Sequence, residues 1–258
     1  MNKQNHDQII SRKKEKTGWL RSAGESLLDL LYPGRCPVCE RILLRNEPMI
    51  CEKCARELPW VREPFCRKCG RMISDPAREL CSDCESRLHY FDEGRAAFLY
   101  EKGMRRSVDR MKFHNHREYI PFYARSMAAA SASVLPVWRP ECILPVPMHP
   151  KKRAERGFDQ SLLLASALGS LTGIRVEDHA LVRTRYTKAS KKLGRESRKK
   201  NMRGVFALDP AVRLPARVLL LDDIYTTGTT MDTASHTLRM SGVREIYFLT
   251  LCIGRGEE

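Results

Sequence analysis

Residues 218–230 read VLLLDDIYTTGTT, and this stretch limits the fold and the kind of site that the chain can form. Its apolar quartet is typical of a parallel strand that helices cover on both faces. Asp222 and Asp223 follow the quartet, and open α/β sheets bind ligands at the carboxyl ends of such strands. The next segment, MDTASHTLRM, has helical spacing. We therefore predict a strand, a loop and a helix with a ligand site between them.

The loop of this unit is suited to a phosphate group. Clustered backbone N–H groups and hydroxyls at a helix N-terminus favour an anion, and the loop consists of Thr226, Thr227, Gly228, Thr229 and Thr230. The alternative is a buried strand whose aspartates cap the next helix, with threonine and glycine as turn residues. The chain has no GxxxxGK[ST] and no GxGxxG after a strand, which argues against a nucleoside triphosphate hydrolase or a dinucleotide enzyme.

Length and composition allow one α/β domain and one small module. The chain has 258 residues, of which 42% are hydrophobic, enough for a sizeable core. Its apolar runs are shorter than a membrane span and its N-terminus lacks a secretory signal, so we expect a cytoplasmic protein. The formal net charge is +15; residues 94–258 hold 29 basic and 16 acidic side chains, whereas residues 32–93 hold eleven of each. The positive excess therefore belongs to the C-terminal part.

Eight of the ten cysteines form four CxxC pairs with eleven residues between successive pairs. Two CxxC turns supply the four tetrahedral ligands of a structural zinc site, so the count predicts two zinc ions. Redox-active pairs and disulfides are the competing interpretations, but a reducing cytosol disfavours stable bridges. Neighbouring pairs are expected to share a metal, and a cross-braced pairing of first with third is the alternative. The predicted ligands are Cys36, Cys39, Cys51 and Cys54 in one site and Cys66, Cys69, Cys81 and Cys84 in the other.

The cysteine module carries no net positive charge, which favours a structural or protein-docking role over capture of nucleic acid. The two other cysteines, Cys142 and Cys252, are expected to be buried small hydrophobes. Residues 1–18 are polar and without hydrophobic periodicity, so we expect a disordered basic tail. Residues 19–93 are predicted to form a short amphipathic helix followed by the double zinc ribbon, and residues 94–258 the α/β domain.

The segment 142–168 holds the second element of the predicted site. An apolar strand ends near Pro147, a basic loop follows, and Asp159 or Ser161 is placed to cap a helix with apolar spacing. Earlier in the chain, apolar residues at 104, 108 and 111 recur at helical spacing with arginines between them, and Lys112 and Phe113 come next.

These patterns together resemble the ComF family, whose members join zinc knuckles to a phosphoribosyltransferase-like domain. The VLLLDDIYTTGTT stretch resembles the signature with which type I phosphoribosyltransferases bind phosphoribosyl pyrophosphate (PRPP). The Lys112–Phe113 pair resembles the Lys-Phe element of the family, and Asp159 stands where asparagine is usual. The family pattern of two prolines and an RGF-N-Q run is similar to Pro145, Pro147, Arg156, Gly157, Phe158 and Gln160.

The resemblance implies a type I phosphoribosyltransferase fold, a mostly parallel sheet with helices on both faces, after a double zinc ribbon. It also implies PRPP with Mg²⁺ as ligand. The 5′-phosphate is then expected on residues 226–230, the ribose on Asp222 and Asp223, and the pyrophosphate near Pro147 and Arg156. Asp222, Asp223 and Arg156 would be the catalytic residues of a transferase, with Lys151, Lys152 and Arg153 as further countercharge. No motif identifies the acceptor of such a transfer.

Residues 183–203 contain ten basic side chains and one acidic one. Their position matches the loop that covers the site in type I transferases, although Ala189 and Ser190 replace the usual Pro-Gln. Closure over PRPP, binding of single-stranded DNA and simple solvation are the three interpretations. The ComF resemblance implies a role in DNA uptake, with other DNA-processing proteins as partners, in which PRPP is a substrate or only a regulator. A protein-docking scaffold is a third hypothesis. The candidate nucleic-acid contacts are Lys191, Lys192, Arg195, Arg198, Lys199 and Lys200.

Overall fold

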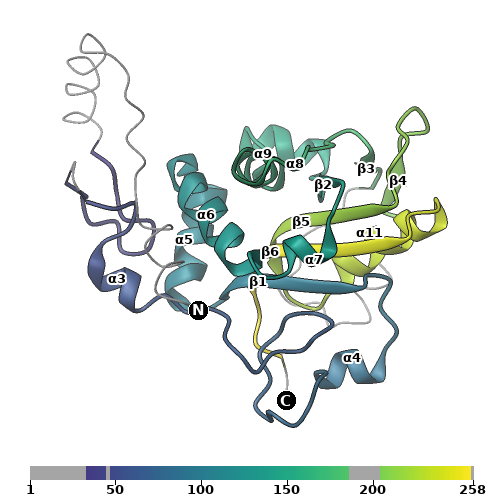
Figure 1. Ribbon diagram of the computed structural model, residues 1–258. Helices are drawn as coiled ribbons and strands as arrows, with labels where there is room; N and C mark the ends of the chain where they lie inside the picture. The colour runs from purple at the N-terminus through teal and green to yellow at the C-terminus, as the bar shows by residue number, and fades with distance from the viewer. Residues whose placement is uncertain (1–32, 45–46, 186–203, 257–258) are drawn as a thin grey trace.

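The computed structural model of the protein describes residues 33–44, 47–185 and 204–256. A four-stranded sheet with the order β1, β6, β5, β2 lies at its centre (Figure 1). Each of these strands runs parallel to its neighbour, which confirms the mostly parallel α/β sheet predicted from sequence. The strands are β1 (Glu93–Leu99), β2 (Cys142–Pro145), β5 (Arg217–Tyr225) and β6 (Glu245–Ile253).

Helices cover both faces of this sheet. Leu219 and Leu221 of β5 belong to one core cluster together with α6 (Ile120–Ser131) and α9 (Gln160–Thr172). The alternate residues Val218 and Leu220 belong to a second cluster on the opposite face together with α11 (Thr229–Met240). A strand that is buried on both faces needs an unbroken apolar run, and this explains the VLLL quartet.

β5 is longer than its apolar quartet predicts. The strand continues through both aspartates to Tyr225, because β6 extends beside it and pairs Asp222 with Thr250 and Tyr225 with Ile253. Asp222 and Asp223 therefore lie inside the carboxyl-terminal half of the strand and not in the loop after it. Parallel pairing gives their backbone a fixed position that a loop would lack.

The helices around the site agree with the predicted spacing, with one correction. α5 (Lys102–Phe113) buries Met104, Val108 and Met111 as expected. The predicted basic loop after β2 is instead the helix α8 (Pro150–Arg156). Pro150 at the first helical turn and the His149 side chain, which accepts a hydrogen bond from the Lys151 N–H at 3.2 Å, begin the helix. Gly157, in the left-handed conformation with φ 81°, ends it.

The cysteine module consists of two similar ribbons that flank the edge strand β1. We define ribbon 1 as residues 35–56, with α3 (Glu52–Arg56), and ribbon 2 as residues 65–86, with α4 (Ser82–Ser86). The segment between them pairs with β1, since the Val61 N–H donates to Ala97 O at 3.0 Å. Ribbon 1 lies beside α5 in Figure 1, and its apolar residues join the same core cluster as α5. The predicted boundary at residue 93 falls on the first residue of β1.

The remaining described elements are small. A two-stranded antiparallel sheet pairs β3 (Leu181–Arg183) with β4 (Phe206–Leu208), and a 3-10 helix (Arg117–Tyr119) and α7 (Leu135–Trp138) complete the set. The predicted tail over residues 1–18, the helix over 19–32 and the candidate nucleic-acid contacts between 191 and 200 lie outside the described residues. Within the described ranges, the helices are too short or too polar to cross a membrane.

Candidate anion and zinc sites

Asp222 lies where β5 meets the first turn of α9. Its Oδ1 accepts hydrogen bonds from Ser161 Oγ and from the Asp223 N–H, each at 2.8 Å. Burial and the charge of Asp223 raise the pKa of Asp222 to about 7, against the lowering effect of these hydrogen bonds and of Lys112. A carboxyl group whose pKa is raised in this way marks a candidate functional position.

Asp223 is 5% exposed and forms a buried ion pair with Lys112 at the end of α5. The Lys112 Nζ lies 2.5 Å from Asp223 Oδ2. Burial alone would lower the pKa of Lys112, but the charges of Asp223 and Asp222 outweigh it and raise that pKa. The sequence predicted no partner for the Lys112–Phe113 pair. The ion pair places Lys112 beside Asp223.

Three further cations lie around the aspartates. Burial lowers the pKa of Arg156, partly offset by Asp223 and Asp159, and burial lowers that of Arg183, partly offset by Asp222. Lys152 has a lowered pKa because of burial and the nearby positive charges of Arg183 and Arg156. Each of these cations therefore interacts electrostatically with one of the two carboxylates or with another cation of the group. The cation cluster consists of Lys112, Lys152, Arg156 and Arg183.

Arg156 is held in position by its neighbours. Its Nη1 donates to Gln160 Oε1 at 2.6 Å, and its guanidinium carbon lies 5.3 Å from the centroid of the Phe113 ring. A planar guanidinium stacked on an aromatic ring is pre-oriented to bind two oxygens of a phosphate. Because Phe113 is 68% exposed, this arrangement faces solvent.

The threonine loop, residues 226–230, turns sharply from β5 into α11. Gly228 has φ 75°, and a Cβ atom there would lie 2.4 Å from Tyr225 Oη, so only glycine fits. Thr227 Oγ1 and Thr229 Oγ1 lie 2.9 Å apart. The N-cap residue of α11 is Gly228, which offers no side-chain cap. The first N–H groups of a helix have no intrahelical partner, so the role of the loop as a phosphate site stays a prediction that this geometry allows.

The loop after β2 is fixed beside the end of β5. The Val146 N–H donates to Leu221 O at 2.8 Å, and the Met148 N–H donates to Asp159 Oδ2 at 3.1 Å. Asp159 also caps α9, since its Oδ1 accepts from the backbone N–H groups of the first turn. One carboxylate thus serves both functions at the position where asparagine is usual. Pro147 lies between the two anchored residues.

The structure thus gathers most of the predicted anion site at one end of the sheet. Asp222, Asp223 and Arg156 lie in it, and Pro147 and the threonine loop border it. Of the basic residues predicted after β2, Lys151 and Arg153 are exposed, whereas Lys152 is half-buried and belongs to the cation cluster. Arg183 was predicted only as one charge of a basic stretch. Nothing in its local sequence indicated its electrostatic interaction with Asp222, because that interaction depends on tertiary packing.

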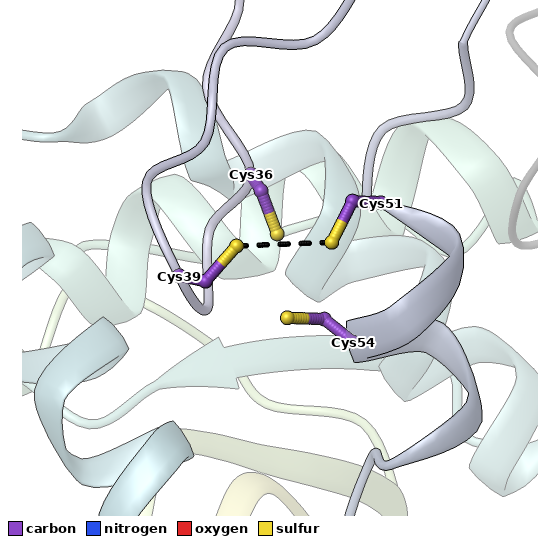
Figure 2. A group of neighbouring side chains, drawn as sticks. All are labelled: Cys36, Cys39, Cys51 and Cys54. Atoms are coloured by element: carbon purple, nitrogen blue, oxygen red, sulfur yellow. Dashed lines mark hydrogen bonds between the residues drawn. The ribbon is translucent and has the colours of Figure 1, made fainter.

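Both groups of four cysteines have the geometry of structural zinc sites. Within each group all four Sγ atoms lie within 4.8 Å of one another. Figure 2 shows the first group, in which Cys39 Sγ and Cys51 Sγ are 3.7 Å apart; Cys69 and Cys81 have the same separation in the second. A tetrahedron with Zn–S bonds of about 2.3 Å has edges of about 3.8 Å. The residues therefore fit two zinc ions, with neighbouring pairs sharing a metal and not the cross-braced alternative.

The other two cysteines are structural. Cys142 and Cys252 are free thiols with no exposed surface, as predicted. Burial raises the pKa of the Cys142 thiol to about 11, and burial likewise raises the pKa of Cys252. Neither thiol is ionised near neutral pH, so neither is suited to nucleophilic chemistry.

The comparisons with known proteins agree with this geometry. The family model for a double zinc ribbon domain matches residues 27–88. The competence protein ComFC of Bacillus subtilis is 28% identical over 206 residues, 78% of this chain and 82% of the relative. The DNA utilization protein YhgH of Salmonella typhi is 27% identical over 229 residues, 86% of this chain and 98% of the relative. These similarities support the resemblance of this chain to the ComF family. Because these matches exceed three quarters of the chain, the ComF likeness extends beyond the zinc ribbons to the α/β sheet.

Proposed function

We propose that this protein belongs to the ComF family, binds PRPP together with Mg²⁺ and acts in the uptake of DNA. One observation carries the proposal: the half-buried Asp222 and the buried Asp223 lie at the carboxyl-terminal end of β5, ahead of the threonine loop, and they interact with the cation cluster. PRPP has a phosphate at one end, a diol in the middle and a pyrophosphate at the other end. Each of these ligand groups has a chemically suitable counterpart among these protein groups.

In this proposal the threonine loop binds the 5′-phosphate and the two aspartates accept hydrogen bonds from the ribose hydroxyls. Arg156 and the other cations bind the pyrophosphate. Mg²⁺ is commonly held by one or two carboxylates together with substrate phosphates, and the paired aspartates beside an anion site fit such an ion. The ammonium group of Lys112 pairs with the carboxylate of Asp223. A pyrophosphate competes for Lys112 and frees Asp223 to accept a hydroxyl.

Two activities fit such a site. In a transferase, an acceptor forms a bond to C1′ as the bond to pyrophosphate breaks, and Arg156 stabilises the departing negative charge. In the second candidate, PRPP regulates the handling of single-stranded DNA. The names of the relatives, competence protein ComFC and DNA utilization protein YhgH, favour this second role, as does the excess of basic residues over positions 183–203.

Calorimetric titration of Mg²⁺-PRPP tests the site. We expect Asp222→Asn to weaken binding at least about tenfold, because an amide accepts a ribose hydroxyl less strongly than a carboxylate does. Asp178→Asn, an exposed aspartate outside the site, is the matched control and should bind like the wild type. Equal affinity of Asp222→Asn and the wild type would show that this assignment is wrong.

The pH dependence of affinity gives an independent test. Because the pKa of Asp222 is raised to about 7, a proton must leave before this carboxylate accepts a hydroxyl. The wild type should therefore bind about tenfold more weakly at pH 6 than at pH 8, beyond the pH dependence of the ligand itself. The Asp222→Asn variant lacks this titrating group, so its affinity measures the pH dependence that comes from the ligand itself. Parallel curves for the two proteins would contradict the role of Asp222.

Thermal unfolding provides the fold control for the same variant. The pKa of Asp222 is raised from 3.8 to about 7 in the folded protein, so the folded state binds more protons than the unfolded chain within that window. The free energy of unfolding therefore falls as the pH rises from 3.8 to about 7, and the full loss of stability is present above pH 7. Asp222→Asn should thus unfold at a higher temperature than the wild type at pH 8. Weaker PRPP binding by a more stable protein cannot result from unfolding.

A pyrophosphate-release assay separates the two activities. Mg²⁺-PRPP is incubated with a panel of nucleobases and amines, with and without single-stranded DNA. Turnover with one acceptor identifies a transferase. Binding of PRPP that DNA strengthens or weakens, without turnover, supports the regulatory role.

A further inference from the structure

We propose that ribbon 2 holds the threonine loop in its ligand-binding shape and that Arg71 is the positioning residue of this clamp. The identity of the ligand rests on the proposed function, whereas the clamp itself rests on the contacts of the described residues. Ribbon 2 is thereby a part of the anion site and not a separate module.

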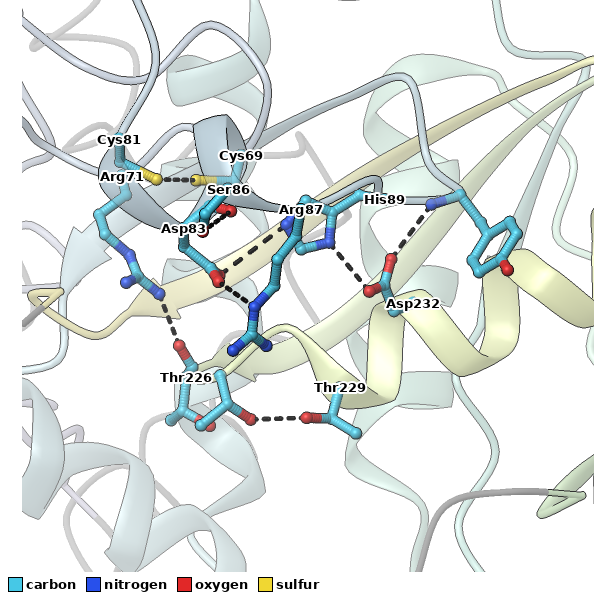
Figure 3. A network of polar contacts seen from close by, with 12 residues as sticks. Cys69, Arg71, Cys81, Asp83, Ser86, Arg87, His89, Thr226, Thr229 and Asp232 are labelled. Atoms are coloured by element: carbon cyan, nitrogen blue, oxygen red, sulfur yellow. Dashed lines mark hydrogen bonds and ion pairs between the residues drawn. The ribbon is translucent and has the colours of Figure 1, made fainter. Parts of the chain in front are cut away.

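The first contact of the clamp runs from ribbon 2 to the beginning of the loop. The backbone of Arg71 belongs to the zinc hairpin, since its carbonyl accepts from the Cys66 N–H at 2.7 Å. Its side chain leaves the hairpin, and Nη2 donates to the carbonyl of Thr226 at 2.6 Å (Figure 3). Arg71 is 6% exposed, and its guanidinium carbon lies 5.8 Å from the Tyr225 ring centroid. A buried charge-assisted hydrogen bond of this kind restrains a loop strongly.

The second contact reaches the helix that follows the loop. His89 Nδ1 lies 2.9 Å from Asp232 Oδ2, and the Tyr90 N–H donates to Asp232 Oδ1 at 3.1 Å. Asp232 belongs to the first turn of α11. On its other side, His89 Nε2 lies 3.8 Å from Asp83, which is in α4 between two zinc-ligand positions. Figure 3 shows this chain of contacts from α4 to α11.

The two contacts flank the residues that would bind a phosphate. Arg71 fixes residue 226 and His89 fixes residue 232, with Gly228 between them. The loop is also packed from behind: the Tyr225 and Phe248 rings are stacked with centroids 4.9 Å apart, and the ribbon 2 cysteines lie in the same core cluster as Tyr225. N–H groups bind an anion best when their directions are fixed beforehand, so loss of the clamp should lower affinity without removing any ligand contact.

The test uses the full chain with its zinc, and its first readout needs no ligand. Arg71→Met removes the guanidinium and keeps an apolar stem; Arg78→Met is the matched control, because Arg78 also belongs to ribbon 2 but pairs with Glu85. Hydrogen exchange of the peptide covering residues 225–232 is measured by mass spectrometry, together with zinc content. We expect two zinc ions in both variants and at least about tenfold faster exchange only in Arg71→Met.

The second readout is the affinity for Mg²⁺-PRPP, which should fall about tenfold in Arg71→Met, the ratio expected for one lost buried hydrogen bond to a charged group. Arg71→Lys, which retains a charged donor, should recover part of the loss, and this rescue would not follow from a merely structural change. If Arg71→Met loses zinc, Asp232→Ala breaks the second contact from outside the ribbon and should also accelerate exchange.

The outcomes separate this inference from the proposed function. Faster exchange in a protein that does not bind PRPP supports the clamp and removes the proposed ligand. Unchanged exchange and unchanged affinity in zinc-loaded Arg71→Met, with PRPP bound by the wild type, overturn the clamp and leave the function intact.

Discussion

The two ribbons have the same cysteine spacing, yet they contact different elements that border the proposed anion site. Ribbon 1 packs against α5: Arg110 Nη1 donates to Val38 O at 3.1 Å, and Arg110 Nη2 lies 3.0 Å from Glu40. Ribbon 2 packs against the threonine loop through Arg71. Both fit one zinc ion, so the difference lies in what surrounds the metal.

Each ribbon therefore supports a different group of the site. α5 ends in Lys112, whose ammonium group pairs with Asp223, so ribbon 1 stabilises the cation side. Ribbon 2 stabilises the threonine loop, which is the proposed phosphate side. The same metal-binding module thus occurs twice beside one sheet. Zinc in each ribbon supplies rigidity where the chain has little hydrophobic core of its own. Identical ligand spacing in the two ribbons therefore does not imply an identical role.

The largest expected effect comes from removing one zinc site at a time. Cys36→Ser/Cys39→Ser and Cys66→Ser/Cys69→Ser should each leave one zinc ion instead of two. Because structural zinc is bound with apparent free energies of about 10 to 16 kcal/mol, each loss should unfold its own ribbon. Exchange should then accelerate in residues 102–113 for the first variant and in residues 225–232 for the second. Acceleration of the same peptides in both variants would show that the two ribbons are not specialised.

A second effect tests the cation side alone. Lys112→Met leaves Asp223 as a buried charge without its partner, which should lower the free energy of unfolding by about 3 to 5 kcal/mol at pH 7.5. The double variant Lys112→Met/Asp223→Asn removes both charges and should recover most of this loss. Denaturant titration measures both quantities. A double variant as unstable as Lys112→Met would mean that the ion pair is not the source of the effect.

Much of this architecture is readable from sequence because it depends on local spacing. The regular CxxC spacing predicted both metal sites and left two pairings open, between which the structure decides. The VLLL quartet with its Thr/Gly run predicted a strand, a turn and a helix. A helix cap at Asp159 or Ser161 was predicted for the same reason, and the structure has Asp159 in that position. These features involve residues a few positions apart, where turn and helix geometry decides the outcome.

The rest depends on packing between distant segments. Lys112 reaches Asp223 because α5 packs beside the end of β5, and Arg71 reaches Thr226 because ribbon 2 lies behind the threonine loop. Neither contact has a pattern in the local sequence. The basic segment after β2 was expected to be a loop, but it forms a short helix that begins at Pro150 and ends at Gly157, its C-cap. Sequence thus predicted the parts of the site, whereas the packing determined which parts meet.

The smallest expected effect separates the supports of the two sides. Arg110→Met removes the contacts between ribbon 1 and α5, one of which joins a cation to a backbone carbonyl, and should cost about 1 kcal/mol of stability. Arg106→Met, an exposed position on the same helix, is the control and should leave stability unchanged. Exchange should rise in residues 102–113 and remain constant in residues 225–232, the reverse of the pattern expected for Arg71→Met. If Arg110→Met instead accelerates exchange in the threonine loop, α5 and that loop form one cooperative unit. The inference that ribbon 1 supports α5 alone and ribbon 2 the threonine loop alone would then be wrong.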